Sequence, residues 1–192
     1  MPTTSETASR ANRGPAAGPS NRRALIAAAR EVYAEAGLGA PFSQVAKRAG
    51  VGQGSLYRHF PDRTALAVAV FEDNIVELER FAAEPDRTIE DLLDLVADQA
   101  IVSTAFIELL SVDPQDQRVV HLGVRYQDVV AQLLERRHAR GEAASIQVED
   151  VLLATEMLAF TIARTPPSRR ADAAARARSI LRSAFRSAGP IR

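Results

Sequence analysis

Apolar residues recur at intervals of three and four positions along most of the chain, the spacing that places side chains on one face of an α-helix. The first such run starts at Asn21, a residue type that caps helices, and stops at Gly37. This run predicts a helix over residues 21–36. Its apolar positions are Leu25, Ala28, Ala29, Val32, Tyr33 and Ala36.

Two short helices and one long helix are predicted next. The first short helix covers residues 43–49, with Pro41 near its first turn and Gly50 at its end, where a positive φ is usual. The second covers residues 53–60. Asp62 can cap the long helix. The apolar positions of that helix are Leu66, Val70, Phe71, Ile75 and Leu78, and it ends near Phe81.

The rest of the chain also has a helical pattern, with no strand and no internal repeat. Thr88 can cap one helix, Gly141 ends another, and the prolines at 166 and 167 separate the last two. The expected fold is all-α with about nine helices: three in an N-terminal unit, one long connector and five in a C-terminal unit. The predicted spans after the connector are residues 89–100, 104–110, 114–140, 147–164 and 171–188.

The two short helices, joined by a tight glycine turn, have the form of a helix-turn-helix. On a helical wheel of residues 53–60, Leu56 and Phe60 share the side that must face a core, and Arg58 with Gly54 lies opposite. Arg58 can offer two donors to guanine, and Gln53 in the first turn can pair with adenine. The pattern therefore predicts a recognition helix for the DNA major groove, with Gly54 allowing a close approach.

Other side chains of this segment have donors for phosphate oxygens, which position a protein on DNA without reading sequence. These are Ser55, Tyr57 and Arg63, with Lys47 and Arg48 on the preceding helix. Three alternatives stay open. Tyr57 could close the core with its hydroxyl in water, His59 could be a packed structural histidine, and Lys47 with Arg48 could be an ordinary solvated face.

The formal net charge is zero, but the charge is unevenly distributed. Residues 1–66 hold nine basic and four acidic residues, whereas residues 67–192 hold fifteen and twenty. A basic N-terminal unit on an acidic remainder fits DNA binding at one end. Residues 1–20 are rich in Pro and Gly and are expected to be a disordered arm; alternatively, Arg10 and Arg13 reach a minor groove when DNA is bound.

Composition argues against other classes. There is no cysteine, no apolar run of about 18 residues for a membrane span, and no apolar core of a signal peptide, so a cytoplasmic protein is expected. His59, His121 and His138 have no partner at metal-ligand spacing. Neither an enzyme, a metal site nor a cofactor is expected.

Residues 46–60, with V-G-Q-G-S-L-Y-R-H-F inside them, resemble the N-terminal domain of the tetracycline-repressor (TetR) family, and the resemblance extends over about residues 22–71. It implies a helix-turn-helix domain over residues 21–66 and a ligand-binding and dimerisation domain over residues 67–188. One departure concerns the second helix, where Ala40-Pro41 replaces the usual capping Thr or Ser. The resemblance implies DNA contacts by Gln53, Ser55, Tyr57, His59 and Arg63.

The resemblance also implies an effector pocket in the C-terminal unit. Its expected apolar lining is Phe71, Ile75, Leu78, Phe106, Leu110, Leu122, Tyr126, Met157 and Phe160, although most of these would be core by default. Arg125 belongs to a polar stripe with His121, Asp128 and Gln132, which is usually a solvated face. If the stripe instead lines a cavity, Arg125 favours an anionic ligand.

A homodimer through the last two helices is expected, partly from the resemblance. Two apolar stripes support it, with packing inside one subunit as the alternative. The stripes are Val148, Val151, Leu152, Thr155, Leu158, Ala159 and Ile162, then Ala174, Ala177, Ile180, Leu181, Ala184 and Phe185. The predicted function is a ligand-responsive repressor on a palindromic operator; the alternative is a TetR-like protein-binding module without an operator.

Overall fold

The computed structural model describes residues 18–102, 105, 108, 115–141 and 146–187. This part of the chain is all-α, as predicted, and contains eight α-helices and one short 3-10 helix. The helices are α1 (Gly18–Ala36), α2 (Phe42–Arg48), α3 (Gln53–His59), α4 (Arg63–Ala83), α5 (Ile89–Val102), α7 (Gln117–Ala139), α8 (Val148–Arg164) and α9 (Arg170–Ser187), with the 3-10 helix η2 (Pro167–Arg169).

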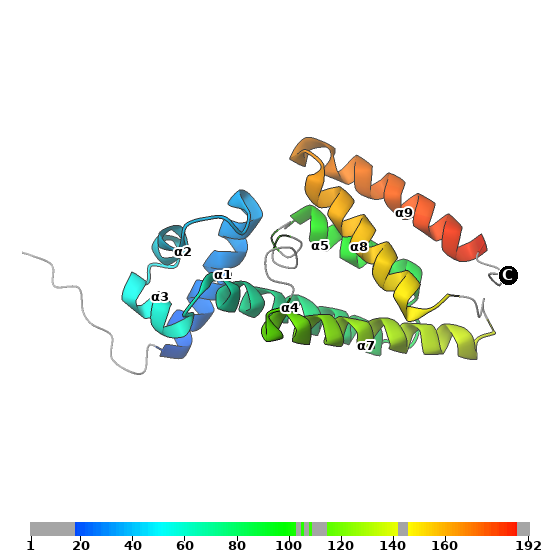
Figure 1. The fold of residues 1–192 in the computed structure, drawn as a ribbon, viewed down its shortest axis with the longest axis horizontal. Coiled ribbons are helices and arrows are strands. Elements are labelled where there is room, and N and C mark those ends of the chain that lie inside the picture. Colours follow the sequence, from blue (N-terminus) through cyan, green and yellow to red (C-terminus); the bar gives the residue numbers. More distant parts are fainter. Residues whose placement is uncertain (1–17, 103–104, 106–107, 109–114, 142–145, 188–192) are drawn as a thin grey trace, which may run out of the picture.

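Helices α1, α2 and α3 form a head at one end of the molecule, and α5, α7, α8 and α9 form a body at the other (Figure 1). Helix α4 leaves the head and lies along α7, while α8 packs on both α5 and α9. Six successive residues of α4, from Leu66 to Phe71, are buried. A helix that is buried all round must have neighbours on every side. This segment of α4 is therefore the place where head and body share one core.

Several helix starts follow the predicted caps. The Asp62 carboxylate accepts the Ala65 N–H at 2.6 Å and begins α4. At α5, the Thr88 hydroxyl accepts the Asp91 N–H at 3.2 Å, and the Asp91 carboxylate accepts the Thr88 N–H at 3.0 Å. This reciprocal capping satisfies two N–H groups that the helix itself leaves free.

The start of the first helix differs from the expectation, and two other predicted segments lie wholly or mostly outside the described residues. Helix α1 begins at Gly18, so Asn21 lies inside the helix and does not cap it, and residues 18–20 do not belong to a disordered arm. Residues 1–17 lie outside the described part. The predicted helix over 104–110 is described only at Ala105 and Glu108, which are both helical.

The apolar stripe of α8 packs inside the protomer. Val151, Leu158 and Ile162 are each at most 1% exposed in the single chain, so the assignment of this stripe to a dimer face was wrong for these residues. The outer face of the same helix carries other large apolar side chains. Leu153, Met157 and Phe160 are 57%, 56% and 43% exposed.

Arginines of α7 fasten the ends of neighbouring helices. Arg136 donates to the carbonyl oxygens of Ala82 and Glu84, at the end of α4. Arg137 is buried, pairs with Glu90 at 3.0 Å and donates to a carbonyl near the end of α9. Cations at carbonyl ends complement the helix dipole. No helix in the described part of the chain has the length and hydropathy to cross a membrane.

Candidate functional site

The α2–α3 pair has the local geometry of a helix-turn-helix. Helix α2 ends at Arg48, two residues before Gly50, whose φ of +64° lies in the region that glycine adopts at little cost. Helix α3 then starts at Gln53. Leu56 and Phe60 are 0% and 2% exposed and anchor α3, which packs against α1 and α2. Both anchors predicted from the helical wheel are confirmed.

The opposite side of α3 is open to solvent. Gln53, Gly54 and Arg58 are exposed, and the Arg58 Nε donates to the Gly54 carbonyl oxygen at 3.3 Å. Tyr57 is 55% exposed, with its ring centroid 5.5 Å from that of Phe42. Tyr57 therefore does not close the core. It stands beside the α2 aromatic ring with its hydroxyl available to a partner.

The two cations at the end of α2 differ in their surroundings. Lys47 is exposed, and no acidic partner lies against it among the described residues. Arg48 pairs with Glu31 at 3.0 Å and with Glu35 at 2.8 Å, both on α1. Hydrogen bonding to Glu35, and then to Glu31, raises the pKa of Arg48, and the same contact lowers the pKa of Glu35. Arg48 is thus already neutralised within the head, and a phosphate contact would have to compete with two carboxylates.

The remaining predicted DNA contacts are half-buried or already engaged. The Ser55 hydroxyl accepts from the Asn21 amide at 3.5 Å, and His59 is half-buried with its ring 6.4 Å from that of Phe60. The exposed Arg63 donates to the Leu38 carbonyl oxygen at 3.1 Å. Arg63 therefore braces the turn after α1, a role that its sequence position did not indicate.

The start of α1 lies beside α3 and carries residues that sequence reasoning left without a role. The Arg22 guanidinium stacks over the Phe60 ring at 5.4 Å, and Arg23 is exposed on the same turn. Two adjacent arginines directly after a Pro- and Gly-rich segment were the available signal. At α2, Pro41 occupies the N-cap position and no side chain caps the helix, as its departure from the family pattern implied.

Comparison with known proteins agrees with this geometry. The family described as "Bacterial regulatory proteins, tetR family" matches residues 25–70, which contain α2, α3 and most of α1. This segment of the chain belongs to the TetR family. Members of this family are transcriptional regulators and not enzymes. No curated protein matches the sequence.

Solved structures of TetR-family regulators share the fold over most of the chain. A TetR transcriptional regulator from Streptomyces coelicolor is 27% identical, with a TM-score of 0.61, and the match covers 87% of this chain and 99% of that one. A putative TetR-family regulator from Rhodococcus is 19% identical, with a TM-score of 0.62 and the same coverages of 87% and 99%. FadR from Bacillus subtilis, solved with stearoyl-CoA, is 20% identical, with a TM-score of 0.59 and coverages of 86% and 97%.

The residues predicted to line an effector pocket separate into three groups. Phe71, Ile75 and Leu78 of α4 and Leu122 of α7 are buried in the interior of the body. Met157 and Phe160 do not belong to that interior, because they lie on the exposed face of α8. Phe106 and Leu110 lie outside the described residues.

The polar stripe of α7 is largely a solvated face, as its spacing suggested. His121, Asp128 and Gln132 are exposed. Arg125 is half-buried and forms a two-point ion pair with Glu79 of α4, at 2.7 and 2.8 Å. This contact raises the pKa of Arg125 and lowers that of Glu79. An anionic ligand at Arg125 would therefore have to displace Glu79.

Tyr126 supplies a polar group to the same interior. Its hydroxyl is buried and has no hydrogen-bond partner of good geometry among the described residues. Burial raises the pKa of Tyr126, and the nearby Thr155 hydroxyl offsets part of the rise. Thr155 donates its own proton to the Val151 carbonyl oxygen at 2.9 Å. A buried phenol without a committed partner is the group that a small ligand could engage.

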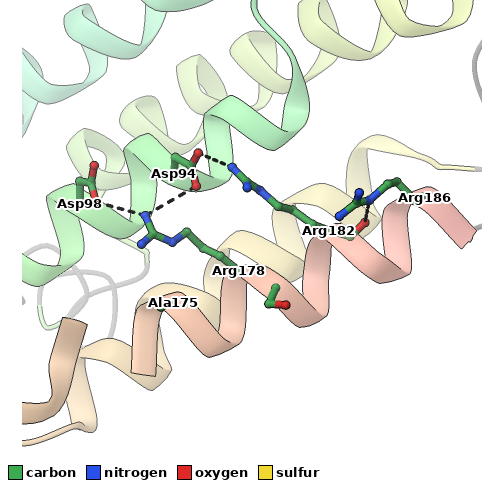
Figure 2. Close-up of a pocket in the computed structure, with 7 residues that line it drawn as sticks. Asp94, Asp98, Ala175, Arg178, Arg182 and Arg186 are labelled. Carbon is green, nitrogen blue, oxygen red and sulfur yellow. Dashed lines mark hydrogen bonds and ion pairs between the residues drawn. The ribbon is translucent and has the colours of Figure 1, made fainter. Parts of the chain in front are cut away.

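A separate cleft of about 490 Å³ lies between α5 and α9 (Figure 2). Arg178 lies 3.3 Å from Asp98 and 3.6 Å from Asp94, and Arg182 also pairs with Asp94. Arg186 donates to the Arg182 carbonyl oxygen at 3.2 Å. The charges of this cleft are thus largely satisfied by one another. The arrangement is an ion-pair ladder that joins the two helices.

Proposed function

We propose that this chain is a ligand-responsive transcriptional repressor that binds a palindromic DNA operator as a homodimer and is released by a small-molecule effector. The observation that carries the proposal is the exposed face of α3, with Gln53, Tyr57 and Arg58 directed to solvent above the buried Leu56. We assign DNA binding to residues 21–66 and effector binding with dimerisation to residues 67–188.

In this proposal, Arg58 and Gln53 read base edges, while the remaining candidates position the helix on phosphates. An arginine can donate two hydrogen bonds to a guanine, and a glutamine can pair with an adenine. Lys47, Ser55 and Tyr57 have donors for phosphate oxygens, and the exposed Arg22 and Arg23 add two cations at the start of α1. Arg48, His59 and Arg63 keep secondary roles, because each has a contact inside the head.

The homodimer is proposed to form through α8 and α9. On α8 the proposed interface is the outer face and not the apolar stripe that packs inside the protomer. Leu153, Met157 and Phe160 follow one another at four- and three-residue spacing and so share one face of α8. On α9, Ile180 is 69% exposed. Large apolar side chains grouped on adjacent helices are typical of a protein interface. A twofold dimer would present two α3 helices to half-sites about 34–36 Å apart.

The effector is proposed to enter the interior between α4, α7 and α8. That region offers the apolar side chains of Phe71, Ile75 and Leu122 together with the uncommitted Tyr126 hydroxyl. Because Arg125 is already paired with Glu79, we favour a largely apolar ligand with one group that can hydrogen bond to a phenol. Release requires that the ligand bind more tightly to the state with low operator affinity.

Genomic footprinting of the purified protein, followed by gel shifts on the recovered site, tests the proposal. Arg58→Ala should relax preference at one position of each half-site by about 1–3 kcal/mol. Arg178→Ala in the α5–α9 ladder is the matched control and should leave the preference intact. Affinity should fall steeply with salt, because phosphate contacts release counterions.

One result would decide against operator binding, and a second would decide against the assigned face of α3. Failure of the wild-type protein to shift any duplex at low ionic strength would favour the alternative of a TetR-like protein-binding module, to which the uncapped α2 lends some support. Unchanged base preference in Arg58→Ala would show that a different face of α3 meets the bases.

A further inference from the structure

The backbone of Leu38, just after α1, is held from two sides by other parts of the molecule. Its N–H donates to the Glu108 carboxylate at 2.7 Å, and its carbonyl oxygen accepts from Arg63 at 3.1 Å. Glu108 lies 70 positions further along the chain, in the body, whereas Arg63 is the first residue of α4. One turn of the head is therefore tied at the same place to the body and to the connecting helix.

The close approach of Glu108 favours glycine at position 37. A Cβ at Gly37 would lie 3.0 and 3.1 Å from the two Glu108 carboxylate oxygens, a tight contact from which the carboxylate would have to withdraw slightly. Gly37 also has a φ of +72°, a conformation that other residues adopt at a cost. The end of α1 thus has both the backbone shape and the space needed to receive a carboxylate from the body.

A second contact joins body and head on another element. Arg118, in the first turn of α7, donates to both carboxylate oxygens of Asp62 at 3.2 Å. Asp62 caps α4 and lies three residues after the end of α3. The same guanidinium is held at 2.6 Å by Asp116, the N-cap residue of α7. Asp116 therefore holds Arg118 in position to reach Asp62.

We propose that Glu108 and Arg118 are positioning residues that form a two-point clasp between body and head and thereby fix the orientation of α3. The inference rests on the proposed function in one respect, since its consequence is measured as operator affinity. The clasp consists of the Glu108–Leu38 and Arg118–Asp62 contacts. It gives the body control over DNA binding through residues that touch neither DNA nor the proposed effector interior.

The physical reason is preorganisation. A dimer that meets two half-sites at once must hold both recognition helices at one separation. A head free to rotate about α4 would lose that freedom on binding, and the lost entropy would weaken the complex. On DNA without an operator no fixed separation is required, so release of the clasp should affect specific binding more than non-specific binding.

The test compares clasp variants with controls in the full-length protein. The clasp variants are Glu108→Ala, Glu108→Gln, Arg118→Gln and the Glu108→Ala/Arg118→Gln double variant. The controls are Arg87→Ala, which removes an exposed ion pair with Glu84, and Glu77→Ala, which removes a contact with Gln99. Each protein is titrated with the footprinted operator and with a scrambled duplex, and exchange of the Leu38 amide proton is followed by NMR.

We expect Glu108→Ala and Arg118→Gln to weaken operator binding by about five- to twentyfold, the scale of a modest coupling energy. Scrambled-duplex affinity and both controls should stay within about twofold of the wild type. Glu108→Gln should recover part of the loss, because its amide oxygen can still accept the Leu38 N–H. The double variant should lose less than the product of the single losses, because both contacts restrain the same motion.

Unchanged operator affinity in both single variants overturns the clasp. So does an equal loss on operator and scrambled DNA, since that pattern indicates weaker folding or weaker phosphate contact. Leu38 amide exchange provides the direct structural readout. It should accelerate in Glu108→Ala, and an unaltered rate contradicts the assigned hydrogen bond.

A measurement without DNA separates failure of the clasp from failure of the proposed function. The chain contains no cysteine, so spin labels can be placed at Ser43→Cys in the head and Gln132→Cys in the body, both exposed positions. Labelled protein is diluted into unlabelled protein so that only distances within one subunit are recorded. The distance distribution should broaden when Glu108→Ala and Arg118→Gln are combined. An unchanged distribution refutes the clasp even if the protein binds DNA, and a broader one supports it even if no operator exists.

Discussion

Some cationic side chains named for DNA contact in the head have no carboxylate partner in the described part of the chain, whereas those that join helices in the body form ion pairs. On the head, Arg58 and Lys47 are exposed and have no carboxylate against them among the described residues. In the body, Arg125, Arg137 and Arg178 are each paired with a carboxylate of a neighbouring helix. An unpaired cation can meet a polyanion without first breaking a contact, whereas a paired one cannot. The charge that matters for DNA is therefore the unpaired part, which in the head lies on α2, on α3 and at the start of α1.

Arg48 shows that the distinction follows contacts and not location. It belongs to the head and lies one residue from Lys47, yet two carboxylates of α1 hold it. Its side chain is 36% exposed, so the pair is partly screened and contributes little to stability. Its main effect is to join α1 to α2. In the head, then, structural and DNA-facing cations stand side by side, and pairing tells them apart.

The largest effect is expected from removing a buried side chain that holds the DNA-facing helix α3 in place. Leu56→Ala should lower the free energy of unfolding by about 2–5 kcal/mol, since Leu56 is fully buried beneath α3. Val124→Ala on the outer face of α7, where the side chain is half-exposed, is the control and should change it by less than about 0.5 kcal/mol. Urea denaturation followed by circular dichroism measures both.

Operator binding gives Leu56→Ala a second readout. The proposed dimer face belongs to the body, so sedimentation should still report a dimer while the operator shift is lost. Retention of full operator affinity would mean that DNA binding does not need α3 to be held by Leu56. The assignment of DNA contacts to the cations on α3 would then be contradicted.

The next test addresses the exposed apolar face of the body. Met157→Asp would bury a carboxylate in the proposed dimer interface, and desolvation of an unpaired ion costs several kcal/mol. We expect the dimer dissociation constant to rise by at least about a hundredfold, or about 2.7 kcal/mol. Gln132→Asp, which adds the same charge at an exposed position of α7, is the control. Sedimentation velocity over a concentration series measures both, and an unchanged constant in Met157→Asp removes α8 from the interface.

The features that the sequence could predict are those that depend on residues close together in the chain. Short-range signals were sufficient for the head: Gly50, the Leu56 and Phe60 anchors, and the Asp62 cap lie where the pattern placed them. The eight helices of the described part were also foreseen within a few residues. These features depend on neighbours a few positions away in the chain.

Predictions that required knowledge of what packs against a helix were less successful. Periodicity indicates that α8 has an apolar stripe, but α8 has apolar residues on two faces, and only packing shows that Val151 faces inward while Met157 faces outward. The roles of Arg63, Glu108 and Arg118 depend on partners 25, 70 and 56 positions away. No local pattern marks such contacts.

Two glycines allow a sharper test of the boundary between head and body. Gly37 and Gly50 both have a positive φ, at +72° and +64°. A Cβ at Gly50 would meet nothing within 4 Å, whereas one at Gly37 would meet the Glu108 carboxylate. Gly50→Ala should therefore cost about 1–2 kcal/mol of unfolding free energy from backbone strain alone. Gly37→Ala should cost about 1 kcal/mol more, because it also disturbs a hydrogen bond to a charged group.

Thermal and urea unfolding of the two glycine variants measure this difference. Combining Gly37→Ala with Glu108→Ala removes the carboxylate, so the extra cost should shrink. Equal destabilisation by the two single variants would indicate that Glu108 does not press against the end of α1.

The smallest expected effect concerns Asp116, at the start of α7. The hydrogen bond from the Arg118 side chain, followed by one from the Arg118 backbone N–H, lowers the pKa of Asp116 to about 2. Because the folded-state pKa lies below the ordinary value, this carboxylate stabilises the protein at neutral pH, and the contribution is lost as the pH falls from about 4 towards 2. NMR titration of the side-chain carboxyl carbon measures it directly.

Arg118→Gln should raise the pKa of Asp116 towards its ordinary range without restoring it fully, because the backbone N–H still donates to the carboxylate at 2.9 Å. The pairing of Arg118 with both Asp116 and Asp62 gives the body its contact with the head. An ordinary pKa for Asp116 in the wild-type protein would mean that the guanidinium does not lie between these carboxylates in solution. Arg118 would then be an unpaired cation in the body. The difference between paired cations in the body and the unpaired Arg58 and Lys47 in the head would then not hold for Arg118.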